Sequence, residues 1–176
     1  MKEYDFTLTF RFNKSEVNPE TYLDALYKAG CDDALLGIGK PGYLVLNFIR
    51  LDSSAMSAIQ SAISDIKTVL TEREAKLIYV APDLVGIREL ADIFQCTGQN
   101  IQKFVNKSTF PSPIYQGSQT IWHLAPVLEW FVANNHAVNK ELLEIAELAN
   151  SINLQIETQT AKPQILNKAL NLLNAS

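Results

Sequence analysis

The fold of this chain is decided by residues 85–131, VGIRELADIFQCTGQNIQKFVNKSTFPSPIYQGSQTIWHLAPVLEWF. The apolar residues of this stretch recur at three and four positions, which is the period of an amphipathic helix. They are Ile87, Leu90, Ala91 and Phe94 before the turn QCT, and Ile101, Phe104 and Val105 after it. The stretch therefore predicts two short helices split by a tight turn, then a turn-rich segment and a third helix.

The second of these helices is predicted to expose amides and lysines. Because its apolar residues take one side, Gln99, Asn100, Gln102, Lys103 and Asn106 must occupy the opposite and flanking surfaces. Asn and Gln side chains suit bidentate contact with adenine, and lysines can meet phosphates or guanine. The helix N-terminus can also hold a phosphate, and Gly98 would let that end approach the nucleic-acid backbone. By pattern alone, a merely solvated polar face is the alternative.

A small β-hairpin is predicted beside the helices. Residues 110–122, FPSPIYQGSQTIW, contain two prolines, an apolar step, a QGSQ turn and a second strand into Trp122. The tip, Gln116 to Gln119, carries small polar side chains that can reach phosphates or the minor groove. The candidate DNA-binding residues are therefore Arg88, Thr97, Gly98, Gln99, Asn100, Gln102, Lys103, Asn106, Lys107, Gln116, Ser118 and Gln119.

Taken in order, these segments resemble the winged helix-turn-helix of the MerR, AlpA and excisionase group of bacterial and phage regulators. The resemblance covers about 50 residues and is carried by residues 87–91, 94–97, 99–105, 110–113 and 122–130. It implies double-stranded DNA as the partner and a role in transcription regulation. The chain departs from the family pattern at Gln95, where glycine is usual, at Gly98, where arginine is common, and at His123, where a basic residue often follows the tryptophan. Each lost cation removes a phosphate contact.

The first part of the chain predicts a ferredoxin-like α+β sandwich over residues 1–81. Its patterns give strands, helices and a turn in the order β-α-β-β-α-β that is typical of this fold. The expected strands are residues 4–12, 34–38, 43–49 and 76–80, with a turn at 39–42 between the second and the third. The first helix starts at Pro19 and ends before Gly30, with Tyr22, Leu23, Leu26 and Tyr27 on its apolar face. The second helix opens at Ser53 and has Ile59, Ile63, Ile66 and Leu70 on its apolar face.

The joint between the sandwich and the middle module is expected at residues 81–84. Pro82 restricts the residue before it, and Asp83 can cap the helix that follows. We therefore place the winged helix-turn-helix domain at residues 82–136 and a helical tail at 137–176.

The tail predicts a long helix over residues 139–160 and a short one over 163–173. The long helix has an a/d spacing that favours a homodimer, and docking on its own subunit is the alternative. The short helix could fold back to cover this seam or the partner. The apolar residues are Leu142, Ile145, Ala149, Ile152 and Ile156 in the long helix, and Ile165, Leu166, Ala169, Leu170 and Leu173 in the short one.

Composition describes a folded protein: hydrophobic residues make up 47% and charged residues 19% of the chain, and the net charge is -4. Residues 84–132 hold three basic and three acidic side chains, so this part is neutral. No apolar run is long enough to span a bilayer and no signal sequence opens the chain, so we expect a cytoplasmic protein without a membrane partner. Cys31 and Cys96 are expected to be buried thiols, and Asp32 and Asp33 to form a solvated turn.

Catalysis has little support in the sequence. His123 and His136 are the only histidines, and neither lies in a nucleophile, metal or nucleotide motif. We therefore expect no enzyme, no cofactor and no metal. The leading hypothesis is a sequence-specific DNA-binding regulator. Two alternatives stay open: an antitoxin or phage-defence interaction protein that binds a protein partner, and an excisionase-like architectural protein that bends DNA.

Overall fold

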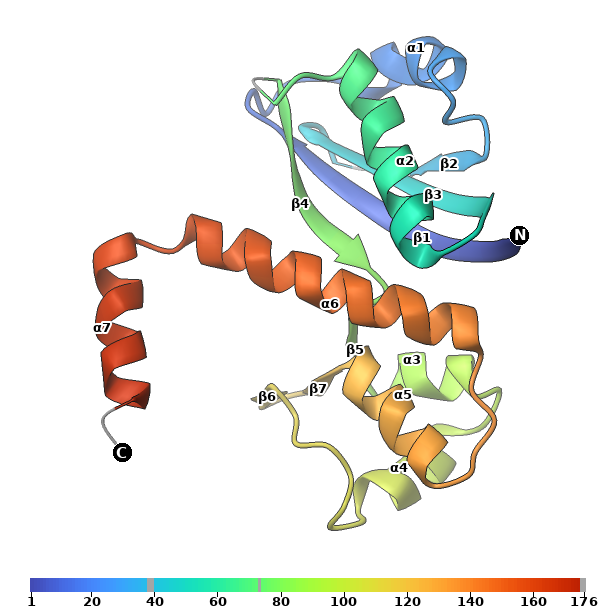
Figure 1. The fold of residues 1–176 in the computed structure, drawn as a ribbon, viewed down its shortest axis with the longest axis vertical. Coiled ribbons are helices and arrows are strands. Elements are labelled where there is room, and N and C mark those ends of the chain that lie inside the picture. Colours follow the sequence, from blue (N-terminus) through green and yellow to red (C-terminus); the bar gives the residue numbers. More distant parts are fainter. Residues whose placement is uncertain (38–39, 73, 175–176) are drawn as a thin grey trace.

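The computed structural model describes residues 1–37, 40–72 and 74–174, which form a mixed α/β chain with two antiparallel sheets (Figure 1). The first sheet has the strand order β2-β3-β1-β4, and all its neighbours are antiparallel. Its strands are β1 (Lys2–Phe12), β2 (Ala34–Gly37), β3 (Tyr43–Asp52) and β4 (Ala75–Ala81). The prediction of four strands in this part is confirmed, although Ile38 and Gly39, assigned to the second strand and its turn, lie outside the described residues.

One face of the first sheet is covered by helices. Alternate side chains of β1, from Tyr4 to Phe12, are buried, as the period-2 pattern predicted. They pack with Ala58, Ala62 and Ile66 of α2 (Ala55–Val69), whose N-cap is Ser54, one residue later than expected. The alternating residues of β1 and the apolar side of α2 therefore build one core.

The first helical segment differs from its prediction. It begins as a 3-10 helix (Pro19–Tyr22) and continues as the six-residue α1 (Leu23–Lys28). Pro19 and Leu26 are buried and Tyr22 stacks on Phe12, but the two other expected core residues, Leu23 and Tyr27, are 41% and 67% exposed. A 3-10 turn places every third residue on one side, so the apolar side is narrower than that of a regular α-helix.

The second sheet brings together strands that flank the central helices. β7 (Thr120–His123) lies between β5 (Leu84–Val85) and β6 (Tyr115–Gln116). The hairpin of β6 and β7 was predicted. β5 begins at the last residue of the expected joint and was not predicted, because two residues are too few to show a period. The helices of this half are α3 (Ile87–Ile93), α4 (Gly98–Val105) and α5 (Leu124–Ala133), and they bury Leu90, Ile101, Trp122 and Phe131.

The tail forms α6 (Lys140–Thr160) and α7 (Pro163–Leu173), in agreement with the predicted ranges. α6 contacts β1, β4 and α2 on one side of the molecule and α5 on the other, and it lies between the two halves in Figure 1. Ile145 and Ala149 are fully buried in the core of the first sheet, and Ala146 is fully buried in the core of the second half. The expected a/d seam is thus covered by its own chain, which is the docking alternative, and it is not free to pair two copies.

α7 has no buried residue, and Ile165, Leu170, Leu172 and Leu173 are among its exposed apolar side chains. Of the helices in the described ranges, none combines the length and the apolar character that a bilayer crossing needs.

Asp83 does not cap the helix after it. Its carboxylate is buried, with Oδ2 accepting from Asn153 Nδ2 at 2.8 Å and Oδ1 lying 2.7 Å from His123 Nδ1. The side chain of Asn153 also makes two hydrogen bonds of 2.8 Å with the backbone of Val80. Its Oδ1 accepts from the Val80 N–H, and its Nδ2 donates to the Val80 oxygen. We call these four residues the Asp83 network. The residue before α3 is Gly86, whose backbone N–H donates to Glu89 Oε2, so the cap role falls to Glu89.

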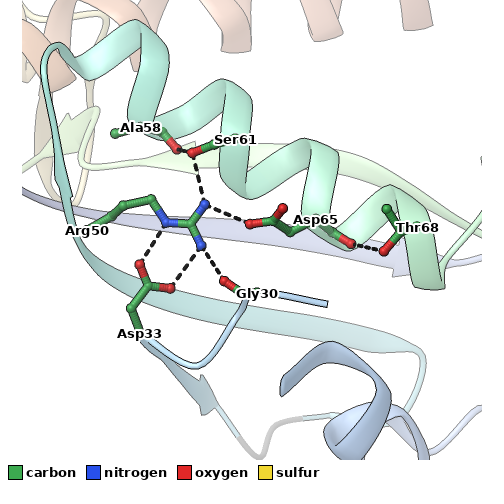
Figure 2. A network of polar contacts seen from close by, with 7 residues as sticks. All are labelled: Gly30, Asp33, Arg50, Ala58, Ser61, Asp65 and Thr68. Carbon is green, nitrogen blue, oxygen red and sulfur yellow. Dashed lines mark hydrogen bonds and ion pairs between the residues drawn. The ribbon is translucent and has the colours of Figure 1, made fainter. Parts of the chain in front are cut away.

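A second polar network holds β3 to α2 and was not predicted (Figure 2). All five N–H groups of the Arg50 guanidinium are used, because it donates to both carboxylate oxygens of Asp33, to Asp65, to Ser61 Oγ and to the backbone oxygen of Gly30. Burial alone would lower the Arg50 pKa, but the bonds to Asp33 and Asp65 outweigh it and raise that pKa. The expected turn at Asp32 and Asp33 is therefore present, with Asp32 exposed, but Asp33 is half-buried in an ion pair instead of solvated.

The two cysteines differ. Cys31 is buried as expected, whereas Cys96 is only half-buried, because it lies in the turn before α4.

Candidate nucleic-acid interface

The outer side of α4 is the centre of the candidate interface. Ile101, on its inner side, is fully buried, and the ring of Phe104 lies edge-on to Trp130 and Phe131. The residues predicted to face outward are all exposed: Gln99, Asn100, Gln102, Lys103, Asn106 and Lys107. Between Gly98 and Lys107 no side chain is acidic. The outer side of the helix thus exposes amides and two lysines, while its inner side packs against the core.

The exposed side chains of α4 contact one another. Lys103 Nζ donates to Asn100 Oδ1 at 3.3 Å, and Gln102 Nε2 donates to Asn106 Oδ1 at 3.0 Å. The second bond links positions one turn apart and uses one donor of Gln102 and the amide oxygen of Asn106. These pairs limit the conformations of the amides, which favours a defined hydrogen-bonding surface over a mobile one.

Lys107 lies just beyond α4 and is held by aromatic rings. Its Nζ is 5.3 Å from the ring centre of Phe104 and 5.4 Å from that of Trp130. Cations are attracted to aromatic faces at such distances. The aromatic rings therefore attract one of the two cations on this surface, although Lys107 stays exposed.

Two candidates at the start of α4 have structural roles. The hydroxyl of Thr97 accepts from the backbone N–H of Asn100 at 3.3 Å and so caps the helix. A Cβ added at Gly98 would lie 3.3 Å from Ile87 Cγ2. Gly98 thus lets α4 pack closely on α3, and its approach to a nucleic-acid backbone stays a prediction.

Arg88 and the hairpin tip form a second group. A groove is lined by residues 86–89 at the start of α3 and residues 118–120 of the hairpin, so Arg88 lies with Ser118 and Gln119. Gln116, Ser118 and Gln119 are exposed. Glu89 also lines the groove and is engaged with the Gly86 N–H. The groove therefore pairs one cation with one carboxylate, and its other polar groups are neutral.

The segment FPSP anchors the hairpin but is not part of its strands. Phe110 is buried edge-on against Trp122 and Trp130, and Trp122 Nε1 donates to the backbone oxygen of Pro111 at 3.0 Å. The backbone pairing begins with the bond from Ile114 N–H to the Ile121 oxygen, and β6 itself starts at Tyr115. The hairpin is thus shorter than residues 110–122, and its orientation is set by the aromatic core beneath it.

Sequence reasoning did not place His136 at this surface. Its ring lies edge-on to Phe104 and Phe131, and it lines a largely apolar hollow beside α4 together with Phe94, Lys103 and Lys107. His136 is 33 positions from Lys103 and belongs to no motif with it, so no spacing could have indicated this neighbour.

The candidate residues therefore fall into an α4 group and a group at Arg88 and the hairpin tip. Comparisons of the chain with protein-family models, with curated proteins and with solved structures found no match.

Proposed function

We propose that residues 82–136 form a winged helix-turn-helix that binds double-stranded DNA, with α4 as the recognition helix and the β6–β7 hairpin as the wing. The observation that carries the proposal is the outer side of α4, where exposed amides and lysines stand on a buried apolar side and no acidic residue interrupts them. Such a surface can enter the major groove without bringing a carboxylate against phosphate.

The topology supports this assignment and that of the flanking domain. α3 and α4 pack on each other, and the hairpin follows α4 in sequence and adjoins the start of α3. In the first 81 residues, the element order β-α-β-β-α-β, the strand order β2-β3-β1-β4 and a single helix-covered face favour a ferredoxin-like sandwich.

The proposed mechanism is occupancy of an operator, as in a transcriptional regulator. Asn100, Gln102 and Asn106 would read adenine edges, so we expect a site that contains A·T pairs. Lys103, Lys107 and Arg88 would contact phosphates, and the wing residues Gln116, Ser118 and Gln119 would reach the backbone or the minor groove.

The proposal includes a homodimer, because the proposed DNA-binding module carries little positive charge. A neutral module attracts DNA weakly, and joining two modules raises the affinity because the second contact becomes intramolecular. Since α6 is buried within its own chain, the pairing surface must lie elsewhere, and the exposed apolar side chains of α7 are the proposed contact. The same exposed helix favours the second candidate function, an interaction protein that binds a protein partner.

The test is selection of bound duplexes from a random library, followed by affinity measurement. The wild type should enrich one site, and the triple variant Asn100→Ala, Gln102→Ala and Asn106→Ala should lose it. A matched control replaces exposed amides outside α4 and α7, Gln60→Ala, Gln155→Ala and Gln159→Ala, and should keep the site. Failure of the wild type to enrich any sequence, or unchanged binding by the first triple variant, would overturn the proposal.

A further inference from the structure

A basic cleft lies at one end of the first sheet, on the side away from its helices. Arg11, Tyr43 and Lys76 line this cleft of about 590 Å³. Their chain neighbours Phe12, Leu44 and Ala75 are buried, so the alternation of strand residues directs these three side chains to the uncovered face. The loop before β3 adds Lys40, and Ser15 also lines the cleft, next to Gly42.

The strand register places the basic residues Arg11 and Lys76 next to each other. Arg11 pairs with Tyr43 on β3 and with Lys76 on β4, so the three side chains form one row across three strands. The Arg11 guanidinium carbon is 5.9 Å from the centre of the Tyr43 ring, and Lys40 Nζ is 5.8 Å from it. Like charges directly opposite each other on neighbouring strands destabilise a sheet. The pair of Arg11 and Lys76 is therefore unfavourable unless an anion lies between them.

Carboxylates do not supply that anion within the described ranges. None of the residues that line the cleft is acidic, and Arg11, Lys40 and Lys76 make no ion pair there. Three acidic residues lie close to the cleft residues in sequence but are not part of the lining. Glu74 accepts from Thr71 and Glu72 from Lys67, although Glu72 also attracts Lys76 electrostatically. Glu16 accepts from Ser15, which lines the cleft. In a chain with a net charge of -4, three cations that share one cleft call for an external partner.

We propose that this cleft binds the phosphate group of a small phosphorylated ligand. The planar guanidinium of Arg11 can hold two phosphate oxygens at once, and Lys40 and Lys76 add point charges. Gly42 shapes the rim: it has φ +83°, and a Cβ there would lie 2.8 Å from the backbone oxygen of Ser15. A larger residue would push the two sides of the rim apart.

The position of the cleft distinguishes it from the proposed DNA surface. The end of β1 and the start of β4 lie at the top of the molecule, whereas α4 lies at the bottom (Figure 1). A duplex bound to α4 would therefore lie at the end of the molecule opposite the cleft. The site is therefore assigned to a separate ligand, and a contact with the DNA backbone is the outcome that would contradict it.

The test uses inorganic pyrophosphate as the probe, with sodium chloride at equal ionic strength as the reference. Pyrophosphate should raise the thermal unfolding midpoint of the full chain in a saturable way, since a ligand that binds only the folded state stabilises it. In NMR titration the amides of Arg11, Gly42, Tyr43 and Lys76 should shift with the same affinity. The double variant Arg11→Gln, Lys76→Gln should bind at least tenfold more weakly. Without ligand it should unfold at the same or a higher temperature, because a repulsion is removed.

Control variants distinguish the proposed phosphate cleft from the proposed DNA surface. Lys28→Gln, Lys162→Gln changes two exposed lysines outside the cleft lining and should leave the pyrophosphate response unchanged. The α4 triple variant should also keep that response. The proposal fails if pyrophosphate has no saturable effect on the wild type, or if the Arg11 and Lys76 double variant responds as the wild type does. It also fails if this double variant loses duplex binding to the same degree as the α4 triple variant.

Discussion

The side-chain amide of Asn153 donates to Asp83 Oδ2 at 2.8 Å, although the two residues are 70 positions apart. Asp83 has a side chain that is 1% exposed, and its other carboxylate oxygen lies 2.7 Å from His123 Nδ1. Through Asn153 the same chain of hydrogen bonds reaches Val80 in β4. One buried polar network therefore ties the first sheet, α6 and the second sheet together, so the two halves are expected to unfold in one step.

Removing Asp83 should be strongly destabilising. The Asp83→Ala variant leaves the Asn153 amide and the His123 ring without their buried acceptor, and breaking such a network costs about 3 kcal/mol or more. Urea unfolding, followed by a signal from each half of the chain, would measure this loss. Asp92→Ala is the control, since Asp92 is exposed on α3 and should change the free energy of unfolding by less than about 0.5 kcal/mol. Equal stability of the two variants would contradict the role given to the network.

Local patterns predicted the elements of this fold well, because hydrophobic periodicity acts over a few residues. The alternation in β1 and the ranges of the last two helices are of this kind. The outward side of α4 followed from its buried side in the same way. Partners distant in sequence could not be predicted: Asp83 meets Asn153, and Asp33 meets Arg50, without any motif. The recurrence of apolar residues at every third and fourth position predicted that α6 has an apolar side. It could not predict which surface covers that side.

Ile145 separates the two interpretations of α6. Because it is fully buried in its own chain, Ile145→Ala should lower the free energy of unfolding by about 2 to 5 kcal/mol, and Ile145→Glu should prevent stable folding. Leu154→Ala is the matched control on the same helix, as Leu154 is 50% exposed. In sedimentation, Leu170→Glu with Leu173→Glu on α7 should convert the proposed dimer to a folded monomer. A folded monomer from Ile145→Glu would instead restore α6 as the pairing surface.

Burial makes the stability contribution of Cys31 depend on pH. The buried site, with the Asp65 carboxylate nearby, raises the thiol pKa from 9.0 to about 11. Between these values the unfolded thiol has lost its proton and the folded one has not, so stability falls as pH rises. The loss is complete above pH 11 and amounts to about 2 to 3 kcal/mol. The difference between the wild type and Cys31→Ala, measured by urea unfolding, should shrink or reverse from pH 8 to 10.5. The control Cys96→Ala should show the same pH dependence of the free energy of unfolding as the wild type. If the difference between the wild type and Cys31→Ala does not change with pH, the raised pKa is refuted.

The salt dependence of DNA binding tests how many phosphates the protein contacts. Arg88, Lys103 and Lys107 in two subunits allow at most about six contacts, so log K should fall with log salt with a slope no steeper than about -5. Lys103→Ala removes one contact from each subunit and should make the slope shallower by about 2. Lys162→Ala, an exposed lysine just before α7, is the control and should leave the slope unchanged. A wild-type slope near about -10 would mean that a further basic surface meets the duplex. The cleft of Arg11, Lys40 and Lys76 would then be the first candidate, and its assignment to a small phosphorylated ligand would fall if Arg11→Gln with Lys76→Gln made that slope shallower.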